Sequence, residues 1–215
     1  MQSRNSLTTA LIGLWIVGTI SAFWVLEWQY LRPVPRPAGA KTAHAEWLPV
    51  SPIAVLETDR GRYTLTESGP ITLINFWNPS CPCSRYMEAH VRKLAKAMGP
   101  KGVRLLTMVE CGDLASERSE ALEAWRSRGI PEFAVVADVG GKYARAFGVW
   151  AAPAAVIING QGRVTYKGAY NAARFCDDPK SAWASNALHE TLEGRIPSRP
   201  SSPFYGCQVV PSISH

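Results

Sequence analysis

Residues 71–84 of this chain read Ile71-Thr-Leu-Ile-Asn-Phe-Trp-Asn-Pro-Ser-Cys-Pro-Cys-Ser84, and they carry the strongest indication of the fold. Its first half is apolar and rich in β-branched residues, which predicts a buried strand. The strand ends at a turn that carries two cysteines, and a helical pattern follows and stops at Gly99-Pro100. The apolar face of that helix consists of Met87, Val91, Leu94, Ala95 and Met98. A strand, a cysteine-bearing turn and a helix together indicate redox chemistry.

Cys81 occupies the position in this turn where a thiol becomes reactive. Proline is favoured at the first position of a helix, so Pro82 predicts that Cys81 is the helix cap. The unpaired N–H groups and the positive dipole end of a helix favour thiolate over thiol. We therefore expect the pKa of the Cys81 thiol to lie below the reference value of about 8.5.

The spacing of the two cysteines is Cys-x-Cys, so Ser84 stands where a dithiol pair would place its second cysteine. Residues three apart on a helix face one another, whereas residues two apart do not. Three roles for Cys81 are open. It is a lone nucleophile whose thiolate accepts a hydrogen bond from Ser84, it pairs with Cys83 in a turn that is not yet helical, or it is resolved by Cys111. The plain structural alternative is that Cys81 and Cys83 are small core residues or a static pair.

The rest of the chain predicts an α/β fold. Apolar runs predict further strands, and 3.6-residue patterns predict further helices. A Gly- and Asn-rich turn between two of the runs indicates a β-hairpin. The order implies a three-layer α/β/α domain with a mixed sheet, in which Cys81 and Cys111 both follow carboxyl ends of parallel strands. The expected strands are 71–77, 103–109, 133–136, 154–158 and 163–167, and the expected helices are 82–98, 114–128, 142–147 and 181–193.

Two motifs give the chain a family resemblance. Phe76-Trp77 is followed four residues later by Cys-Pro, and residues 147–153 read Phe-Gly-Val-Trp-Ala-Ala-Pro before an apolar run and Asn-Gly-Gln-Gly. Over about residues 51–196 the chain resembles the thioredoxin-like superfamily, in particular its membrane-anchored, extracytoplasmic thiol–disulfide oxidoreductases related to cytochrome-maturation proteins. It also resembles an uncharacterised branch with Phe-Trp-x-Pro-x-Cys-Pro-Cys-Ser and a late Gly-Cys, here Gly206-Cys207.

The resemblance implies site residues. Cys81 matches the nucleophile, and Pro153 matches a cis-proline whose preceding residue pairs through its backbone with a bound substrate strand. Two positions depart from the pattern, because Ser84 replaces the second cysteine and Asn75 replaces a buried acid. Glu110 is a candidate proton carrier in place of that acid, although a surface carboxylate is the simpler interpretation.

Three functions from different classes follow. The first is a thiol–disulfide oxidoreductase whose partners are protein thiols and disulfides and which needs no cofactor. The second is a copper-binding or copper-delivering module of thioredoxin fold, with Cys81 and Cys83 as soft ligands for Cu(I). The third is a non-catalytic interaction domain. We rank them in this order, because a copper site favours a histidine near the thiols and His90 lies two turns along the helix.

The late cysteines Cys176 and Cys207 lie in polar, Pro- and Ser-rich surroundings. We expect them to form a structural disulfide that ties the last helix to the tail. Closing a loop of about thirty residues contributes roughly 3 kcal/mol in the chain-entropy model. Such a bond requires an oxidising compartment.

The N-terminus predicts a membrane anchor. Residues 7–26 contain no charged side chain and match the length of a bilayer-spanning helix, and no small-residue cleavage site follows soon after. We divide the chain into an N-terminal tail (1–6), a transmembrane helix (7–26), a Pro-rich linker (27–50), a thioredoxin-like domain (51–196) and a Pro/Ser-rich tail (197–215).

The orientation signals of this segment disagree. Arg4 precedes the span, and Arg32, Arg36 and Lys41 follow it, which weakly favours a cytoplasmic domain. The five cysteines and the habit of the family favour the exterior. We therefore expect a single-pass protein of a bacterial inner membrane with a periplasmic domain.

Composition excludes one class of partner. The formal charge of +6 is spread along 215 residues, without a basic cluster or interleaved aromatic side chains. Nucleic-acid binding is therefore not expected. The oligomeric state has no signal in the sequence.

Overall fold

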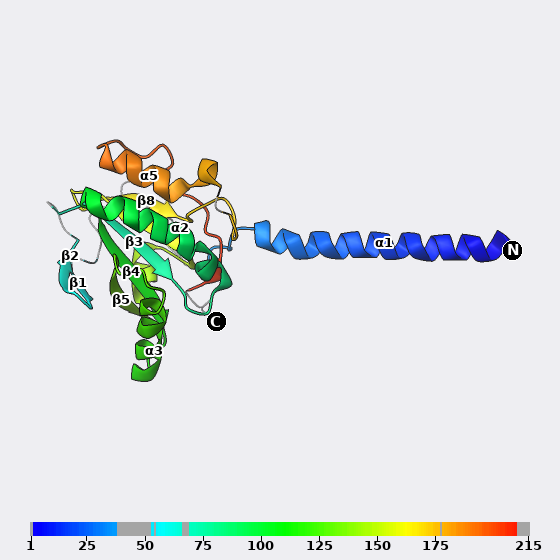
Figure 1. Ribbon diagram of the computed structural model, residues 1–215, viewed down its shortest axis with the longest axis horizontal. Helices are drawn as coiled ribbons and strands as arrows, with labels where there is room; N and C mark the ends of the chain where they lie inside the picture. Colours follow the sequence, from blue (N-terminus) through cyan, green and yellow to red (C-terminus); the bar gives the residue numbers. More distant parts are fainter. Residues whose placement is uncertain (1, 38–52, 54, 66–68, 177, 210–215) are drawn as a thin grey trace. The chain divides into compact units, whose positions relative to one another are not determined.

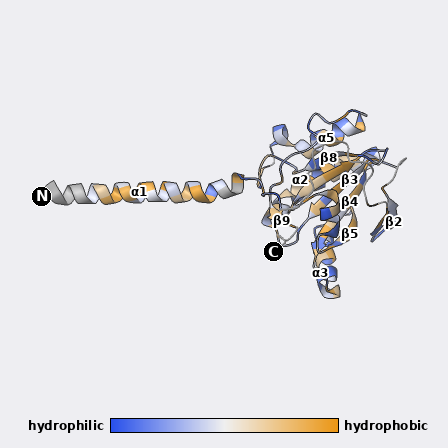
Figure 2. Ribbon diagram, turned by 180° about the vertical axis from the view of Figure 1, so that it is seen from behind, coloured by the Kyte–Doolittle hydropathy of each residue, from blue (hydrophilic) through white to orange (hydrophobic). Residues whose placement is uncertain are grey.

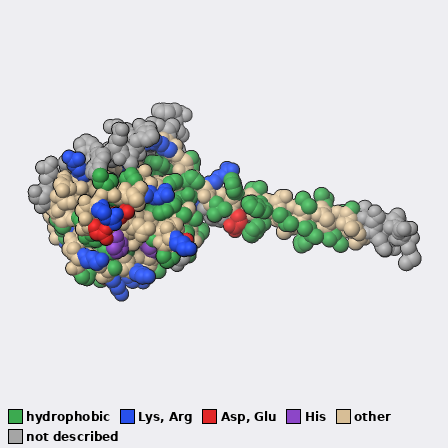
Figure 3. All heavy atoms as spheres, turned by 90° about the horizontal axis from the view of Figure 1, so that it is seen from above, with side chains coloured by type: hydrophobic (Ala, Val, Ile, Leu, Met, Phe, Trp, Pro, Cys, Tyr) green, Lys and Arg blue, Asp and Glu red, His purple; other side chains and the backbone are tan. Residues whose placement is uncertain are grey.

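The computed structural model describes residues 2–37, 53, 55–65, 69–176 and 178–209. The chain divides into two units, Met1–Arg32 and Pro33–His215. The first unit is a single helix, α1 (Gln2–Leu31), with hydrophobic residues along it (Figure 2), whose side chains are drawn in Figure 3. Within the described residues, Thr8–Trp28 is the one helical stretch long and apolar enough to cross a membrane.

The second unit is built on a five-stranded mixed sheet of order β5-β4-β3-β7-β8 (Figure 1). The central strand β3 pairs in parallel with β4 and antiparallel with β7, and β4 pairs in parallel with β5. All six residues of β3 are buried, which explains its nearly continuous apolar sequence. The strands are β3 (Thr72–Trp77), β4 (Arg104–Cys111), β5 (Ala134–Val139), β7 (Ala154–Ile158) and β8 (Val164–Gly168).

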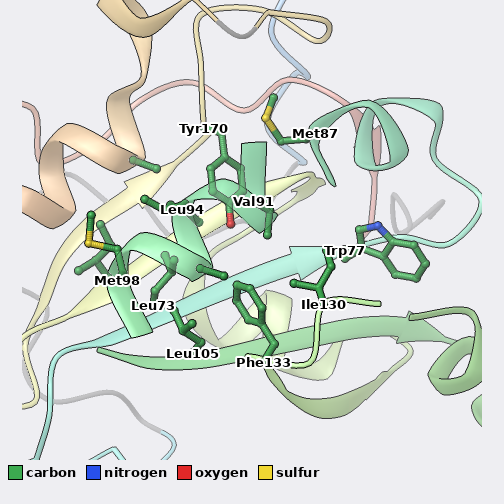
Figure 4. Close-up of a cluster of buried hydrophobic side chains, with 14 of the residues drawn as sticks. Leu73, Trp77, Met87, Val91, Leu94, Met98, Leu105, Ile130, Phe133 and Tyr170 are labelled. Atoms are coloured by element: carbon green, nitrogen blue, oxygen red, sulfur yellow. The ribbon is translucent and has the colours of Figure 1, made fainter. Parts of the chain in front are cut away.

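Helices α2 (Pro82–Met98), α3 (Ala115–Arg126) and α5 (Trp183–Leu192) contribute to one of the two hydrophobic clusters that line the sheet. Figure 4 shows part of this cluster, which includes Met87, Val91, Leu94 and Met98 of α2 and Leu73 of β3. The second cluster contains α4 (Lys142–Phe147) and residues from both ends of the domain. The prediction of a mixed sheet with helices, and of each of its main elements, is confirmed.

Two small strand pairs had no sequence signal. A short hairpin of β1 (Val55–Thr58) and β2 (Gly61–Thr64) precedes the sheet. Strands β6 (Ala151–Ala152) and β9 (Cys207–Gln208) form a separate two-residue pair. These strands are too short for an alternating pattern to be recognised. Two 3₁₀ turns complete the described elements, η1 (Gly99–Lys101) and η2 (Pro179–Ser181).

Residues 200–209, the C-terminal segment, pack on the domain, although residues 197–215 were expected to form a tail. The N–H of Lys167 in β8 donates to the Pro200 carbonyl at 3.1 Å, and the N–H of Ser202 donates to the Lys167 carbonyl at 3.2 Å. Gly168 permits this approach, because a Cβ there would lie 2.8 Å from the Ser202 nitrogen. Phe204 is buried with its ring centroid 4.3 Å from that of Trp150. The edge of β8 and one aromatic side chain thus make this segment part of the domain.

Candidate active site

Cys81 lies where the carboxyl end of β3 passes into α2. It is the N-cap of that helix, with an extended backbone (φ −88°, ψ 118°) and Pro82 in the first turn. The N–H of Arg85 donates to its carbonyl at 3.2 Å, and its side chain is fully buried. The predicted helix-cap position of Cys81 is confirmed.

Cys81 forms a disulfide with Cys207, 126 residues later in the chain, with a Cα–Cα distance of 5.8 Å. The expected bond between Cys176 and Cys207 is therefore wrong. Cys176 is a free, half-buried thiol whose Sγ lies 3.5 Å from the Ser181 hydroxyl. The error has a physical cause: the sequence does not show that residues 200–209 follow the edge of β8 and carry Cys207 to the start of α2.

The backbone around Cys207 pairs with the strand that precedes Pro153. Strand β9 is antiparallel to β6, with Cys207 opposite Ala152 and Gln208 opposite Ala151. The Ala152–Pro153 peptide bond is cis, as predicted. The Cys81 Sγ lies 3.4 Å from the Ala152 carbonyl oxygen, a contact that becomes a hydrogen bond only when reduction returns a proton to the sulfur. Cys81, the cis-proline and the paired strand thus meet at one place.

Cys83 is a buried free thiol beside this disulfide. The sulfur atoms of Cys81, Cys83 and Cys207 all lie within 4.8 Å of one another. Residues two apart point away from each other only where both have a helical backbone. The backbone of Cys81 is extended, so its sulfur and that of Cys83 are able to lie close together. Burial raises the pKa of the Cys83 thiol, and the nearby guanidinium of Arg174 offsets part of this effect.

Cys111 ends β4, buried and free, and it is not among these three clustered sulfurs. Burial raises the pKa of its thiol; Arg118 opposes this shift, and the carboxyl groups of Asp138 and Glu110 add to it. The structure therefore pairs Cys81 with neither of the two resolving candidates, Cys83 and Cys111.

Glu110 is half-buried, with part of its side chain still open to solvent. Burial raises its pKa to about 7, although the side-chain amide of Asn78 donates to it and favours the charged form. The same Asn78 belongs to the turn before Cys81, where its Oδ1 accepts from the N–H of Ser80 at 2.7 Å. Glu110 is thus linked to the turn that precedes Cys81.

Ser84 and Asn75 form hydrogen bonds with other residues around the site. The buried Ser84 hydroxyl oxygen accepts from the N–H of Asn78 at 3.3 Å. Asn75 donates to the Thr107 hydroxyl at 3.4 Å, and its Oδ1 accepts from the Tyr170 hydroxyl at 2.9 Å. Because an amide does not titrate, Asn75 does not take over the proton transfer of the acid that it replaces.

Sequence reasoning missed Arg174, which lies near the Cys83 thiol, and Gly206, which packs against the Ala152 backbone. Two sequence signals were available for Gly206-Cys207. The first was the late Gly-Cys motif of the resemblance, and the second was an aromatic residue in a Pro/Ser-rich segment. Neither signal says which cysteine Cys207 meets.

Residues 52–208 match the family described as a domain of unknown function (DUF6436), about three quarters of the chain. The chain belongs to this family. The match ends one residue after Cys207, so it includes the β6–β9 pair and both bonded cysteines.

Curated relatives of this family member carry a redox name. The thiol:disulfide interchange protein DsbE of Haemophilus influenzae is 30% identical over 103 residues, which are 48% of this chain and 52% of that protein. DsbE of Yersinia pestis is 31% identical over 103 residues, or 48% and 50% of the two chains. The chain thus spans about half the length of the curated relatives it matches.

Solved structures show the fold. An uncharacterised conserved protein from Geobacillus kaustophilus superposes with a TM-score of 0.65 at 21% identity, covering 80% of this chain and 96% of that one. A hypothetical protein from Sinorhizobium meliloti gives a TM-score of 0.61 at 20% identity, covering 78% and 97%. These superpositions, the strand order and the DsbE similarity together show that the domain is thioredoxin-like, as predicted.

Proposed function

We propose that this protein is a membrane-anchored thiol–disulfide oxidoreductase in which Cys81 is the nucleophile and Cys207 the resolving cysteine. One observation carries the proposal: Cys81 caps the amino end of α2 and is bonded to Cys207 directly beside the Ala152–Pro153 peptide. The similarity to two DsbE proteins supports the same class of reaction.

The reaction needs only these two sulfurs and a partner. In the reduced protein, the Cys81 thiolate attacks one sulfur of a partner disulfide, forming a mixed disulfide and expelling the partner's other sulfur as a thiolate. The Cys207 thiolate then attacks the Cys81 sulfur, which forms the Cys81–Cys207 bond and releases the partner's remaining thiolate. Two electrons pass to the partner, and the reverse sequence oxidises a partner dithiol. The reduction potentials of the two couples set the direction.

The helix terminus favours the first step. The N–H groups of the first turn of α2 and the helix dipole stabilise negative charge on Cys81, which makes it the attacking thiolate and the better leaving group. Cys83 is buried like Cys81, but it lies inside the first turn and not at the cap, and burial raises the pKa of its thiol. The environment therefore selects Cys81 over its neighbour.

The site is tested by trapping the mixed disulfide. The full chain in detergent is reduced and mixed with a disulfide-bonded protein, and the products are separated without reducing agent. Cys207→Ser should accumulate the mixed disulfide, Cys81→Ser should form none, and the matched control Cys176→Ser should turn over like the parent. A trap in Cys83→Ser or Cys111→Ser instead would assign the resolving role to that residue and overturn this scheme.

We place the protein in a bacterial inner membrane with the domain in the periplasm. The support is the apolar length of Thr8–Trp28 and the similarity to DsbE. A disulfide between Cys81 and Cys207 also requires an oxidising compartment or an oxidised partner. A C-terminal alkaline phosphatase fusion should be active. An inactive fusion together with an active cytoplasmic reporter would reverse the orientation, and an N-terminus cleaved after the helix would remove the anchor.

A second candidate function is Cu(I) binding. Three thiols within 4.8 Å of one another are a suitable set of soft ligands once the disulfide is reduced. It ranks second because two of the three sulfurs are bonded to each other. Reduced protein should then hold one Cu(I) against a chromophoric chelator, and Cys81→Ser, Cys83→Ser and Cys207→Ser should each abolish binding while Cys111→Ser retains it. If the protein neither competes for copper nor exchanges disulfides, the third candidate function, a non-catalytic interaction domain, is the better account.

A further inference from the structure

We propose that Cys83 is a third redox residue of this site: its thiolate attacks the Cys207 sulfur of the disulfide, forms a Cys83–Cys207 bond and releases Cys81 as a free thiolate. The inference rests on the proposed function, in which Cys81 and Cys207 carry the reaction. It gives the oxidised protein a further activity, the rearrangement of disulfides in a partner protein without net electron transfer.

The three sulfur atoms are already placed for this exchange. Those of Cys81, Cys83 and Cys207 lie within 4.8 Å of one another, so Cys83 reaches the disulfide without a change of fold. Cys83 is the free thiol of this cluster, and its side chain is buried. A thiol that is held beside a disulfide reacts at the high effective concentration of an intramolecular step.

The two sulfurs of the disulfide differ as leaving groups. Attack on the Cys207 sulfur expels Cys81, whose thiolate is stabilised by the N–H groups and the dipole at the start of α2. Attack on the Cys81 sulfur would expel Cys207, which lies in the two-residue strand β9 and caps no helix. Because a thiolate of lower pKa leaves faster, the exchange is directed at the Cys207 sulfur.

Arg174 places a positive charge beside the attacking sulfur. Burial raises the pKa of the Cys83 thiol, and the Arg174 guanidinium opposes this shift by charge attraction and by a hydrogen bond to the sulfur. The Nε of the same guanidinium is buried without a hydrogen-bond partner among the described residues. Arg174 is thus a positioning residue that stabilises the Cys83 thiolate at the moment of attack.

The exchange also moves the free sulfur to a better place for negative charge. Before the exchange the free sulfur is that of the buried Cys83, and afterwards it is that of Cys81 at the helix cap. Each unit by which the pKa of Cys81 lies below the working pH favours the exchanged form about tenfold. The oxidised protein therefore keeps a reactive thiolate, although one of its disulfides is formed.

A free Cys81 thiolate in the oxidised protein is able to act on a partner. It attacks one sulfur of a partner disulfide, forms a mixed disulfide and expels the partner's other sulfur as a thiolate. A different thiolate of the partner then attacks the partner sulfur of the mixed disulfide, which forms a new partner disulfide and expels Cys81 again. The Cys83–Cys207 bond stays intact, so no electrons are gained or lost by either protein.

Removal of Cys81 tests whether Cys83 and Cys207 are able to bond. The full chain with Cys81→Ser is oxidised in detergent with oxidised glutathione, the glutathione is removed, and free thiols are counted after denaturation. Because the chain has five cysteines, four remain; two should be free, and peptide mapping without reduction should find the Cys83–Cys207 bond. The matched control, Cys81→Ser with Cys83→Ser, should keep all three of its thiols free. Four free thiols in Cys81→Ser, or a bond from Cys207 to another cysteine, would overturn the inference.

Alkylation shows whether the exchange takes place in the parent chain. The oxidised parent is treated with iodoacetamide at pH 8 and digested without reduction, and fragmentation next to Pro82 distinguishes the two neighbouring cysteines. The label should appear on Cys81, in molecules that hold the Cys83–Cys207 bond. A label on Cys83 alone, with the Cys81–Cys207 bond intact, would overturn the inference.

The pH dependence of this labelling tests Arg174. Arg174→Met should slow the labelling of Cys81 severalfold and move its pH profile to higher pH, because the Cys83 thiolate then forms less readily. Arg174→Lys should restore most of the rate, and Arg126→Met, at an exposed arginine, should behave like the parent. A profile that does not move in Arg174→Met would remove Arg174 from the scheme.

A comparison of the parent with Cys83→Ser separates this inference from the proposed function. Each oxidised chain is incubated, without added thiol, with an enzyme whose disulfides have been scrambled, and recovery of that enzyme's activity is followed. The parent should restore activity about tenfold or more faster than Cys83→Ser. Equal rates, while reduced Cys83→Ser still reacts with a partner disulfide, would overturn the exchange and leave the proposed function intact. A reduced parent whose Cys81 attacks no disulfide would overturn the proposed function itself.

Discussion

The two segments that carry the bonded cysteines are held in different ways. Cys81 lies between a fully buried strand and a 17-residue helix, whose apolar face packs against the sheet. Cys207 lies on a segment without a helix, whose β9 strand has two residues. Backbone hydrogen bonds to β8 and β6 and one buried ring hold that segment. Cys81 is thus positioned by local structure, whereas Cys207 is positioned by contacts between distant residues.

An ionisable group lies beside each of these segments, and the two groups have opposite effects on stability. Glu110 is linked through Asn78 to the turn before Cys81, and burial raises its pKa to about 7. Lys167 pairs with the C-terminal segment; burial and then repulsion from Arg36 lower its pKa to about 8. Each group favours its neutral form in the folded protein, so one opposes folding at high pH and the other at low pH.

The largest expected effect on stability comes from cutting the link between the two segments. The Cys81–Cys207 bond closes a loop of 126 residues, which corresponds to up to about 5 kcal/mol in the chain-entropy model. Cys207→Ser should lower the free energy of unfolding by up to this amount, as measured by urea denaturation without reducing agent. Cys176→Ser, at a free thiol, should change it by less than about 0.5 kcal/mol. Equal midpoints for Cys207→Ser and the parent would show that the bond adds nothing to stability.

Next in size is the anchor of the C-terminal segment. Phe204→Ala should cost about 3 kcal/mol in the oxidised protein, because it removes a buried ring from the contact with Trp150. After reduction the loss should be smaller, since the segment is then able to detach without unfolding of the sheet. The control is Phe175→Ala, at a ring that is 45% exposed. If the two substitutions lower the free energy of unfolding equally, or if reduction does not alter the effect of Phe204→Ala, Phe204 is not the anchor of the C-terminal segment.

A smaller effect, with the opposite sign, is expected at Lys167. Its Nζ is buried without a hydrogen-bond partner among the described residues. Because its folded pKa of about 8 lies below the unfolded value, the cost of the charge is complete below pH 8 and disappears as the pH rises toward 10.5. Lys167→Met should therefore raise the free energy of unfolding at pH 7 by about 1 to 3 kcal/mol. Lys101→Met, at an exposed lysine, should leave it unchanged, and a destabilised Lys167→Met protein would refute the argument.

The smallest effect is expected at Glu110. Its folded pKa of about 7 lies above the ordinary value of 4.5, so the folded protein binds more protons and loses stability as the pH rises from about 4.5 to 7. Glu110→Gln should match the parent at pH 4 and be more stable at pH 8 by on the order of 1 kcal/mol, a figure reduced for solvent screening. Thermal unfolding at a series of pH values measures the difference. If the stability of the two proteins depends on pH in the same way, ionisation of Glu110 does not destabilise the folded protein.

The parts that sequence reasoning predicted share a physical feature. Strand β3, helix α2 and the cap position of Cys81 follow from an apolar run, an apolar helical face and Pro82, all within thirty residues. The cis bond at Pro153 followed from the resemblance. The hairpin β1–β2 was missed because each of its strands has four residues and most of their side chains are at least partly exposed.

Reasoning along the chain was enough to predict a thioredoxin-like domain that follows an apolar helix, and to place Cys81 at the start of a helix, because neighbouring residues decide burial patterns and helix caps. The cysteine that bonds to Cys81 depends on contacts between distant residues. From spacing and surroundings, Cys83 and Cys111 were the partners expected for Cys81, and Cys207 was assigned to Cys176. The choice depends on the path of residues 200–209 along β8 and on the fit of Gly206 against Ala152, and such contacts between distant backbones leave no periodic pattern in the chain.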